Sequence, residues 1–206
     1  MFSDIAIPKN NEAEFFEIAS RLNVKKLYFL YDFDSHNEEK IKNKLDSINH
    51  KNISVEMGFI VSKKNLNKAA KISRLLVARS SELDRFFIES KKIKLIFGFE
   101  EFHKRDYLHQ RASGLNHVIC DIANKNNVVV GFSYGQLFNN DKMNSAVLLG
   151  RLMQNISLCQ KYNLRTVIGA FSSNPFDLRY HYDISSLFGI LGMGGKNIKE
   201  SLDYTL

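Results

Sequence analysis

Cations and aromatic rings gather in one short segment of this sequence. The segment contains His103, Lys104, Arg105, Tyr107, His109 and Arg111, immediately before a stretch with helical periodicity. Positive side chains, ring faces and the free backbone N–H groups of a helix start suit a phosphodiester backbone and unstacked bases. A similar mixture, Arg179 to Tyr182, follows a later apolar run. The pattern predicts RNA binding, and the alternative is that both segments are ordinary solvated loops.

The sequence also offers histidines and carboxylates, but not at the spacing that a metal site needs. The candidates are Asp4, Asp32, Asp34, His36, Glu56, Glu100, Glu101, His103 and His109. No HxH or HExxH pair is present, and the six histidines are scattered, so no two of them are forced onto one ion. Adjacent carboxylates, such as Glu100 with Glu101, are typical of solvated loops. We expect no metal and no catalytic carboxylate pair.

Glycine-rich phosphate loops are missing as well. Neither GxxxxGK[ST] nor GxGxxG occurs, although these patterns let backbone N–H groups surround phosphates. The closest stretch, Gly192 to Lys196 (GMGGK), has no strand before it and is interpreted as a turn between two short helices. The sequence therefore predicts no cofactor and no catalytic residue in the chain itself.

Length and composition favour one globular unit. With 206 residues and 44% hydrophobic residues, we expect a single domain over residues 1–206. The net charge of +7 favours a polyanionic partner. Cys120 and Cys159 form no CxxC pair, which predicts buried free thiols in a reducing cytoplasm. Neither a leader nor an apolar run near the roughly 18 residues of a membrane span is present, so we expect a soluble, cytoplasmic protein without a membrane partner.

Seven apolar segments alternate with helical segments along the chain. The predicted strands are 4–7, 26–31, 53–61, 75–78, 93–97, 128–132 and 166–171. The predicted helices are 12–22, 38–48, 66–74, 82–91, one that begins after Ser113, then 144–162, 183–191 and 196–202. This alternation indicates βαβ units with right-handed crossovers. An open doubly wound sheet and a small (β/α) barrel both satisfy it, and periodicity alone does not separate them.

The chain from His109 to Ser133 forms one loop–helix–strand unit around which the candidate residues lie. Leu115, Ile119 and Ile122 belong to an apolar stripe at helical spacing. Ser113 is the predicted cap of this helix, because its hydroxyl can accept a hydrogen bond from the first turn. Gly114 gives the backbone freedom to enter the helix. The unit places the basic loop at the mouth of a βα element, where α/β folds usually keep their sites.

Residues 111–133 (RASGLNHVICDIANKNNVVVGFS) closely resemble the signature of the ribonuclease P protein component 3 family, the p30-type subunit of archaea and eukaryotes. The likeness continues through AVLLGRLMQNISLCQKYNLRTVIGAFSS and FDLRYHYDISSLFGILGMGGKNIKESL. The resemblance implies a TIM-barrel-like fold related to polymerase-and-histidinol-phosphatase barrels, without their metal ligands. It further implies a non-catalytic subunit of an endoribonuclease. Such a subunit binds ribonuclease P RNA and precursor tRNA, partners with a Pop5-type subunit and other ribonuclease P proteins, and supports 5′-leader removal.

The resemblance also ranks the candidate RNA-binding residues. Arg111 and His117 come first, while Ser113, Gly114 and Asn116 shape the loop and cap. Arg179 comes second, and Lys104 and Arg105 rest only on charge and position. His117 and Ser113 each have a purely structural alternative, as a side chain bonded within helix packing and as a simple cap.

Two rival functions stay open on the sequence. One is a metal-dependent phosphoesterase on the same barrel, which needs several converging His and carboxylate ligands. The other is a protein-interaction scaffold that binds partners but no RNA.

Overall fold

The computed structural model describes residues 2–34, 38–48, 52–103, 105–106, 108–109, 111–138 and 142–206, without the side chains of residues 142 and 143. Lys104, Tyr107 and His36, which the sequence pointed to, lie outside these residues. Within them no helix is both long enough and apolar enough to cross a membrane.

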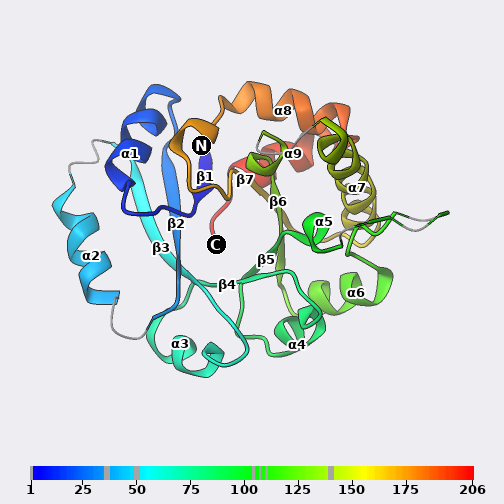
Figure 1. Ribbon diagram of the computed structural model, residues 1–206, viewed down its shortest axis with the longest axis horizontal. Coiled ribbons are helices and arrows are strands. Elements are labelled where there is room, and N and C mark those ends of the chain that lie inside the picture. The colour runs from blue at the N-terminus through cyan, green and yellow to red at the C-terminus, as the bar shows by residue number, and fades with distance from the viewer. Residues whose placement is uncertain are drawn as a thin grey trace.

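Seven parallel strands lie side by side in chain order in the described part of the chain (Figure 1). They are β1 (Ser3–Ala6), β2 (Lys26–Asp32), β3 (Ser54–Ile60), β4 (Leu76–Arg79), β5 (Leu95–Phe97), β6 (Val129–Ser133) and β7 (Thr166–Gly169). The Phe171 N–H donates to the Ile5 carbonyl at 2.8 Å, and the Ile7 N–H to the Ser172 carbonyl at 2.9 Å. These bonds join the end of β7 to β1. The fold is therefore a small (β/α) barrel, because a doubly wound sheet would reverse its strand order.

Helices cover the outside of this barrel. They are α1 (Glu12–Arg21), α2 (Glu38–Ser47), α3 (Leu66–Ile72), α4 (Asp84–Glu89), α5 (Phe99–Phe102), α6 (His117–Lys125), α7 (Lys142–Lys161), α8 (His181–Ile190) and α9 (Gly195–Leu202), with 3₁₀ turns η1 (Gly135–Leu137) and η2 (Pro175–Asp177). The short α5 was not predicted from the sequence. Both α8 and α9 follow β7, where a larger barrel would continue with an eighth strand.

The barrel interior is packed with side chains. Gly58, Gly131 and Gly169 face inward, and a Cβ on any of them would come within 3.0 Å of a neighbouring side chain. Small inward residues thus make room for large ones in a narrow barrel. At the carboxyl ends of the strands the rings of Phe97 and Phe171 stack with centroids 4.4 Å apart. Aromatic packing therefore occupies the mouth of the barrel interior.

The seam between β1 and β7 is completed by a side chain. Asp4 is fully buried, and its carboxylate accepts the Ala170 N–H at 2.8 Å and the Tyr134 hydroxyl at 2.5 Å. Phe171 has a left-handed φ of 45°, which ends β7 two residues earlier than predicted. Asp4, one of the candidate metal ligands, thus replaces the missing backbone partner of Ala170.

We expect the variant Asp4→Ala to lose about 2 kcal/mol of unfolding free energy, because it leaves the Ala170 N–H and the Tyr134 hydroxyl buried without an acceptor. Urea-induced unfolding measures this loss. Asp4→Asn, which keeps one acceptor oxygen, should lose less. A loss equal for both variants would contradict the role of the carboxylate at the seam.

Candidate RNA interface

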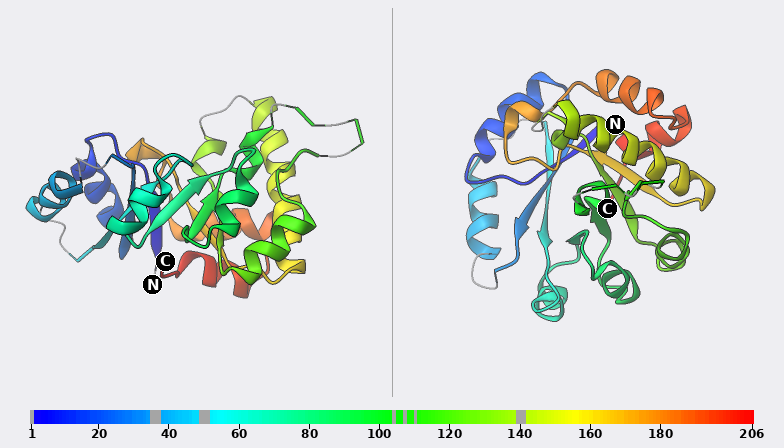
Figure 2. Two further views of the ribbon diagram at one scale, coloured as in Figure 1. Left: turned by 90° about the horizontal axis from the view of Figure 1, so that it is seen from below. Right: turned by 45° about the vertical axis from the view of Figure 1, so that its right-hand side comes forward.

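The basic segment predicted from the sequence follows β5 and α5. In the left view of Figure 2 it extends from the barrel on the side opposite α9 and the two chain ends. The carboxyl ends of the strands also lie on that side. Loops there usually carry the functional residues of (β/α) barrels. The prediction that this loop stands at the mouth of a βα element is confirmed.

One buried arginine holds the base of this loop. Arg151, in α7, is only 3% exposed. Its guanidinium donates to the carbonyls of Glu100 at 2.8 Å and His103 at 2.6 Å, and to the Asp106 carboxylate at 2.8 Å. The same carboxylate oxygen accepts the Ala112 N–H at 2.8 Å. Arg151 therefore connects both ends of the basic loop to one rigid helix, and these contacts hold the pKa of Asp106 below its usual value. Arg151 thus contacts Asp106 through its side chain, but Glu100 and His103 only through their backbone carbonyls.

The entry into α6 differs from the prediction in its cap. Asn116 is the N-cap, and its Oδ1 accepts the Ile119 N–H at 3.0 Å. Ser113 is buried outside the helix, and its carbonyl accepts the Asn155 amide at 2.8 Å. Its hydroxyl has no hydrogen-bond partner among the residues that the structure describes. The prediction that Ser113 caps the helix is therefore wrong, because the helix begins only at His117.

Gly114 makes this late start possible. Its φ is +87°, and a Cβ there would lie 2.5 Å from the Phe99 carbonyl oxygen. Only glycine fits both the left-handed backbone and the close approach to α5. Its predicted role in shaping the loop agrees with this geometry.

The candidate cations fall into two sets. Arg105, Arg111 and His117 are exposed around the base of the loop. The Arg111 guanidinium lies against α7, because a Cβ at Gly150 would come 2.9 Å from Arg111 Nε. The exposed Arg111 side chain therefore lies beside Gly150, the residue that precedes the buried Arg151 in α7.

Arg179 belongs to another part of the barrel rim. It donates to the carbonyls of Phe176 at 2.6 Å and Leu178 at 2.9 Å, and its guanidinium lies 4.1 Å from the centroid of the Phe138 ring. Among the described residues no hydrogen bond or ion pair joins it to the loop before α6. Arg105, Arg111 and His117 therefore share their exposure and their place along the chain in or next to the loop, whereas Arg179 is held in a separate contact.

The two neighbouring glutamates of α5 have different surroundings. Glu101 forms an ion pair with Arg79 at 2.7 Å. Glu100 is 2% exposed, and burial raises its pKa to about 7, although the Ser133 backbone and the Asn155 amide oppose the rise. Neither Glu100 oxygen makes a hydrogen bond of standard geometry. The sequence-based expectation that both carboxylates are solvated is therefore wrong for Glu100, which α5 buries.

The proposed metal ligands do not converge. Across the described ranges no three His, Cys, Asp or Glu side chains are grouped as a metal site would need. Asp4 completes the seam, and Glu56 pairs with Lys26 at 2.8 Å. The described residues thus give the phosphoesterase alternative no ligand set.

One sequence motif needs the structure to be interpreted. Residues 131–135 read Gly-Phe-Ser-Tyr-Gly, the G-x-S-x-G pattern of hydrolase nucleophiles. Ser133 is buried at the end of β6, and its hydroxyl donates to the Ala170 carbonyl at 3.2 Å. In the part of the chain that the structure describes, no histidine is hydrogen-bonded to it. The motif is therefore part of the barrel wall and lacks the base that a nucleophile requires.

Comparison with known proteins decides the family. Residues 105–206 match the family described as RNase P subunit p30. The chain belongs to the ribonuclease P p30 family. The match begins in the basic loop and includes Asp106, Gly114 and Arg151, whereas the carbonyls of Glu100 and His103 that Arg151 contacts precede it.

Individual relatives agree with the p30-family assignment. Ribonuclease P protein component 3 of Methanococcus vannielii is 24% identical over 142 residues, which are 66% of this chain and 62% of that protein. The Methanosarcina acetivorans protein of the same name is 30% identical over 83 residues, 40% of this chain and 35% of that protein. The chain thus spans less than two thirds of the relatives it matches. A chain in the cryo-EM structure of archaeal ribonuclease P with mature tRNA shares the fold, with a TM-score of 0.75, 20% identity and coverage of 97% and 87% of the two chains.

Proposed function

We propose that this p30-family chain is a non-catalytic protein subunit of ribonuclease P. In this role it binds the catalytic RNA and supports 5′-leader removal from precursor tRNA, with a Pop5-type subunit and other ribonuclease P proteins as partners. The observation that carries the proposal is the loop held by Arg151, which has Arg105, Arg111 and His117 exposed around it. Residues 1–206 would act as one domain in the cytoplasm.

The proposed contribution is physical rather than chemical. Exposed cations neutralise RNA phosphates and release their counterions. A loop fixed to a packed helix presents these cations in one arrangement, so less conformational entropy is lost when RNA binds. The relatives named ribonuclease P protein component 3 and the fold shared with a chain of archaeal ribonuclease P support this assignment.

The test is affinity purification of the chain from its native cell at moderate salt, followed by sequencing of bound RNA. We expect enrichment of one structured RNA and cleavage of precursor tRNA by the eluate. Protein partners without RNA would favour the scaffold alternative. Stoichiometric metal without RNA would favour a phosphoesterase.

Arg111→Ala tests the loop itself. We expect a modest loss of RNA affinity. The negative slope of log K against log salt should also become shallower by about 0.7 to 0.9, because one phosphate contact is removed. Filter binding at several salt concentrations measures both quantities. Arg21→Ala, at the end of α1 and similarly exposed, is the matched control and should leave the slope unchanged. An unchanged slope for Arg111→Ala would count against this loop as the RNA contact.

A further inference from the structure

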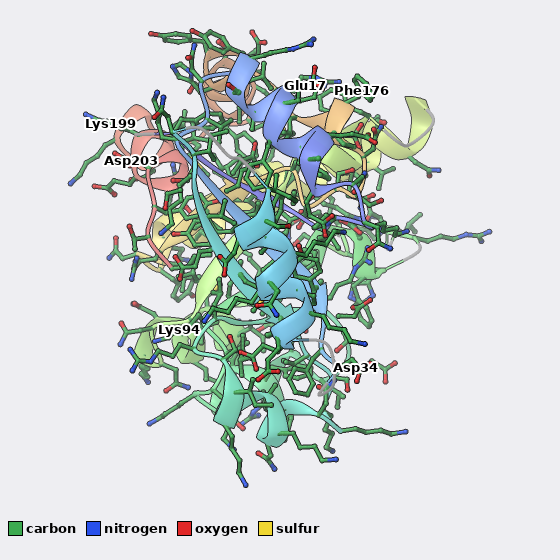
Figure 3. All side chains as sticks on the ribbon, turned by 90° about the vertical axis from the view of Figure 1, so that its left-hand side faces the viewer. Glu17, Asp34, Lys94, Phe176, Lys199 and Asp203 are labelled. Atoms are coloured by element: carbon green, nitrogen blue, oxygen red, sulfur yellow. The ribbon has the colours of Figure 1, made fainter. Side chains whose placement is uncertain are left out.

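A groove lies at the amino-terminal ends of β1 and β2, between the turn that follows α1 and the helices α8 and α9. Its volume is about 490 Å³. Phe2, Ile198 and Leu202 supply apolar surface, and each is nearly buried by the surrounding fold. Figure 3 shows Lys199 and Asp203 together on the opposite side of the barrel from Asp34. In the left view of Figure 2 the basic loop extends on the side opposite α9, so the groove is remote from it.

The polar groups around this groove are mainly positive. Lys25 and Lys199 line it and are exposed. His181 also lines it, and its Nδ1 is buried with no hydrogen-bond partner in the described part of the chain. Asp203 is the acidic residue among the lining side chains, and it already has an interaction partner. Two cations beside an apolar floor complement a carboxylate that is attached to an apolar side chain.

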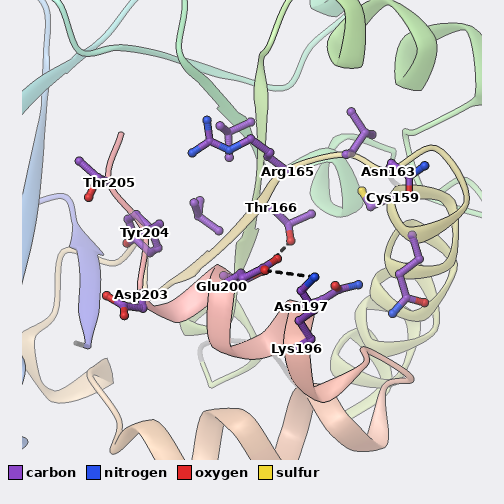
Figure 4. A pocket seen from close by; sticks show the side chains of 15 residues that line it. Cys159, Asn163, Arg165, Thr166, Lys196, Asn197, Glu200, Asp203, Tyr204 and Thr205 are labelled. Atoms are coloured by element: carbon purple, nitrogen blue, oxygen red, sulfur yellow. Dashed lines mark hydrogen bonds and ion pairs between the residues drawn. The ribbon is translucent and has the colours of Figure 1, made fainter.

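A second cavity offers a useful contrast. It measures about 550 Å³ and lies between the end of α7, the start of β7 and α9 (Figure 4). Arg165, Lys196, Glu200 and Asp203 line it, and Lys196 lies 3.9 Å from Glu200. Its charges of both signs favour no particular ligand. Of these two cavities, the groove is the one that combines an apolar floor with an excess of positive charge.

We propose that the groove binds an acidic, apolar segment of a partner protein. A large aliphatic or aromatic side chain would pack on Phe2, Ile198 and Leu202, and a neighbouring Asp or Glu would pair with Lys25 or Lys199. RNA fits less well, because a phosphate backbone needs a row of cations rather than an apolar floor. The inference goes beyond the proposed RNA-binding function and does not depend on it.

Two variants test the apolar contact and the ion pair separately. Gly195 lines the groove, and a Cβ added there meets nothing within 4 Å, so Gly195→Phe should fill the groove without straining the fold. Lys199→Glu reverses one charge beside it. Lys196→Glu makes the same change of net charge on the same helix, but Lys196 does not line the groove. It is the matched control.

The experiment selects short random peptides displayed on phage against the full chain, with Gly195→Phe used to remove unrelated binders. We expect enriched peptides that combine Asp or Glu with a large apolar residue. A synthetic peptide of that sequence should bind about tenfold more weakly to Lys199→Glu and to Gly195→Phe, and equally well to Lys196→Glu. Circular dichroism checks that the variants fold, and if Gly195→Phe does not, selection against Lys199→Glu replaces it.

Several results would overturn the proposal. One is that the full chain enriches peptides no more than Gly195→Phe does. Another is that the enriched peptides are basic. A third is that Lys199→Glu and Lys196→Glu lose peptide binding equally. Loss of RNA binding in Lys199→Glu but not in Lys196→Glu would assign the groove to RNA instead. Retained RNA binding in all three variants is expected, so failure of this proposal is distinguishable from failure of the RNA-binding proposal.

Discussion

Arg151→Met is expected to lower the free energy of unfolding by about 3 kcal/mol, because the removal of one member of a buried charged network leaves its partners without compensation. The carbonyls of Glu100 and His103 and the Asp106 carboxylate all lose a donor at once. Methionine keeps much of the apolar volume, so the loss reports the polar network rather than a cavity. Urea-induced unfolding gives the number. The RNA affinity should also fall more than in Arg111→Ala, because several cations lose their common support.

Arg85→Met is the matched control for this prediction. Arg85 is 67% exposed and pairs with Glu89 at 2.7 Å on the same helix, so its removal should cost no more than about 0.5 kcal/mol. Asp106→Asn and the double variant complete a cycle that isolates the coupling between Arg151 and Asp106. If Arg151→Met costs no more than Arg85→Met, the network does not hold the loop.

Arg151 also shows which features of the fold the sequence does not predict. The alternation of apolar runs correctly predicted seven strands and most helices, because each run must bury its face. For α7, however, the pattern counted only apolar residues as inward. Arg151, Asn155 and Cys159 recur at intervals of four and share the buried face with Leu152 and Ile156. A cation at an inward position is a signal that the sequence contains, but two of its three acceptors are backbone carbonyls, which no sequence pattern displays.

The cap of α6 illustrates a second limit. Ser113 and Asn116 are both good N-cap residues, and local sequence does not choose between them. The choice depends on the approach of Gly114 to Phe99, a contact between segments that close only when β5 and α6 pack. The strand after α7 ends early for a similar reason, since Asp4, far away in sequence, takes the Ala170 N–H. The role of the candidate residues in RNA binding stays a prediction.

The closure of the barrel illustrates a third limit of prediction from the sequence. Periodicity left an open sheet and a barrel equally possible, and the difference is two hydrogen bonds between β1 and the end of β7. Inward glycines at positions 58, 131 and 169 are consistent with a narrow barrel, yet a glycine within a strand also indicates a bulge or a close backbone approach. Periodicity therefore predicted the α/β class, and the choice of a barrel came only from the family resemblance, which the closed strand order confirms.

Glu100 should make the stability of this protein depend on pH near neutrality. Its pKa rises from 4.5 to about 7 when it is buried in the fold. Between these values the folded chain binds more protons than the unfolded chain, so stability falls as the pH rises. The stabilisation is fully present below 4.5 and is lost above about 7. The loss from this one group amounts to about 3 kcal/mol. Asp4, whose pKa is raised from 3.8 to about 6, contributes a separate loss at lower pH.

Glu100→Gln isolates the contribution of this carboxyl group. Glutamine has nearly the shape of the protonated acid, and it cannot ionise. We therefore expect the variant to gain about 3 kcal/mol over the unmodified chain between about pH 4.5 and pH 7.5, as measured by urea-induced unfolding across that range. Glu101→Gln removes the neighbouring carboxylate, whose partner Arg79 is largely exposed, and should leave the pH dependence nearly unchanged. If the unmodified chain and Glu100→Gln lose stability in parallel as the pH rises, the carboxyl group at position 100 is not the group that titrates, and Asp4 becomes the group to replace next.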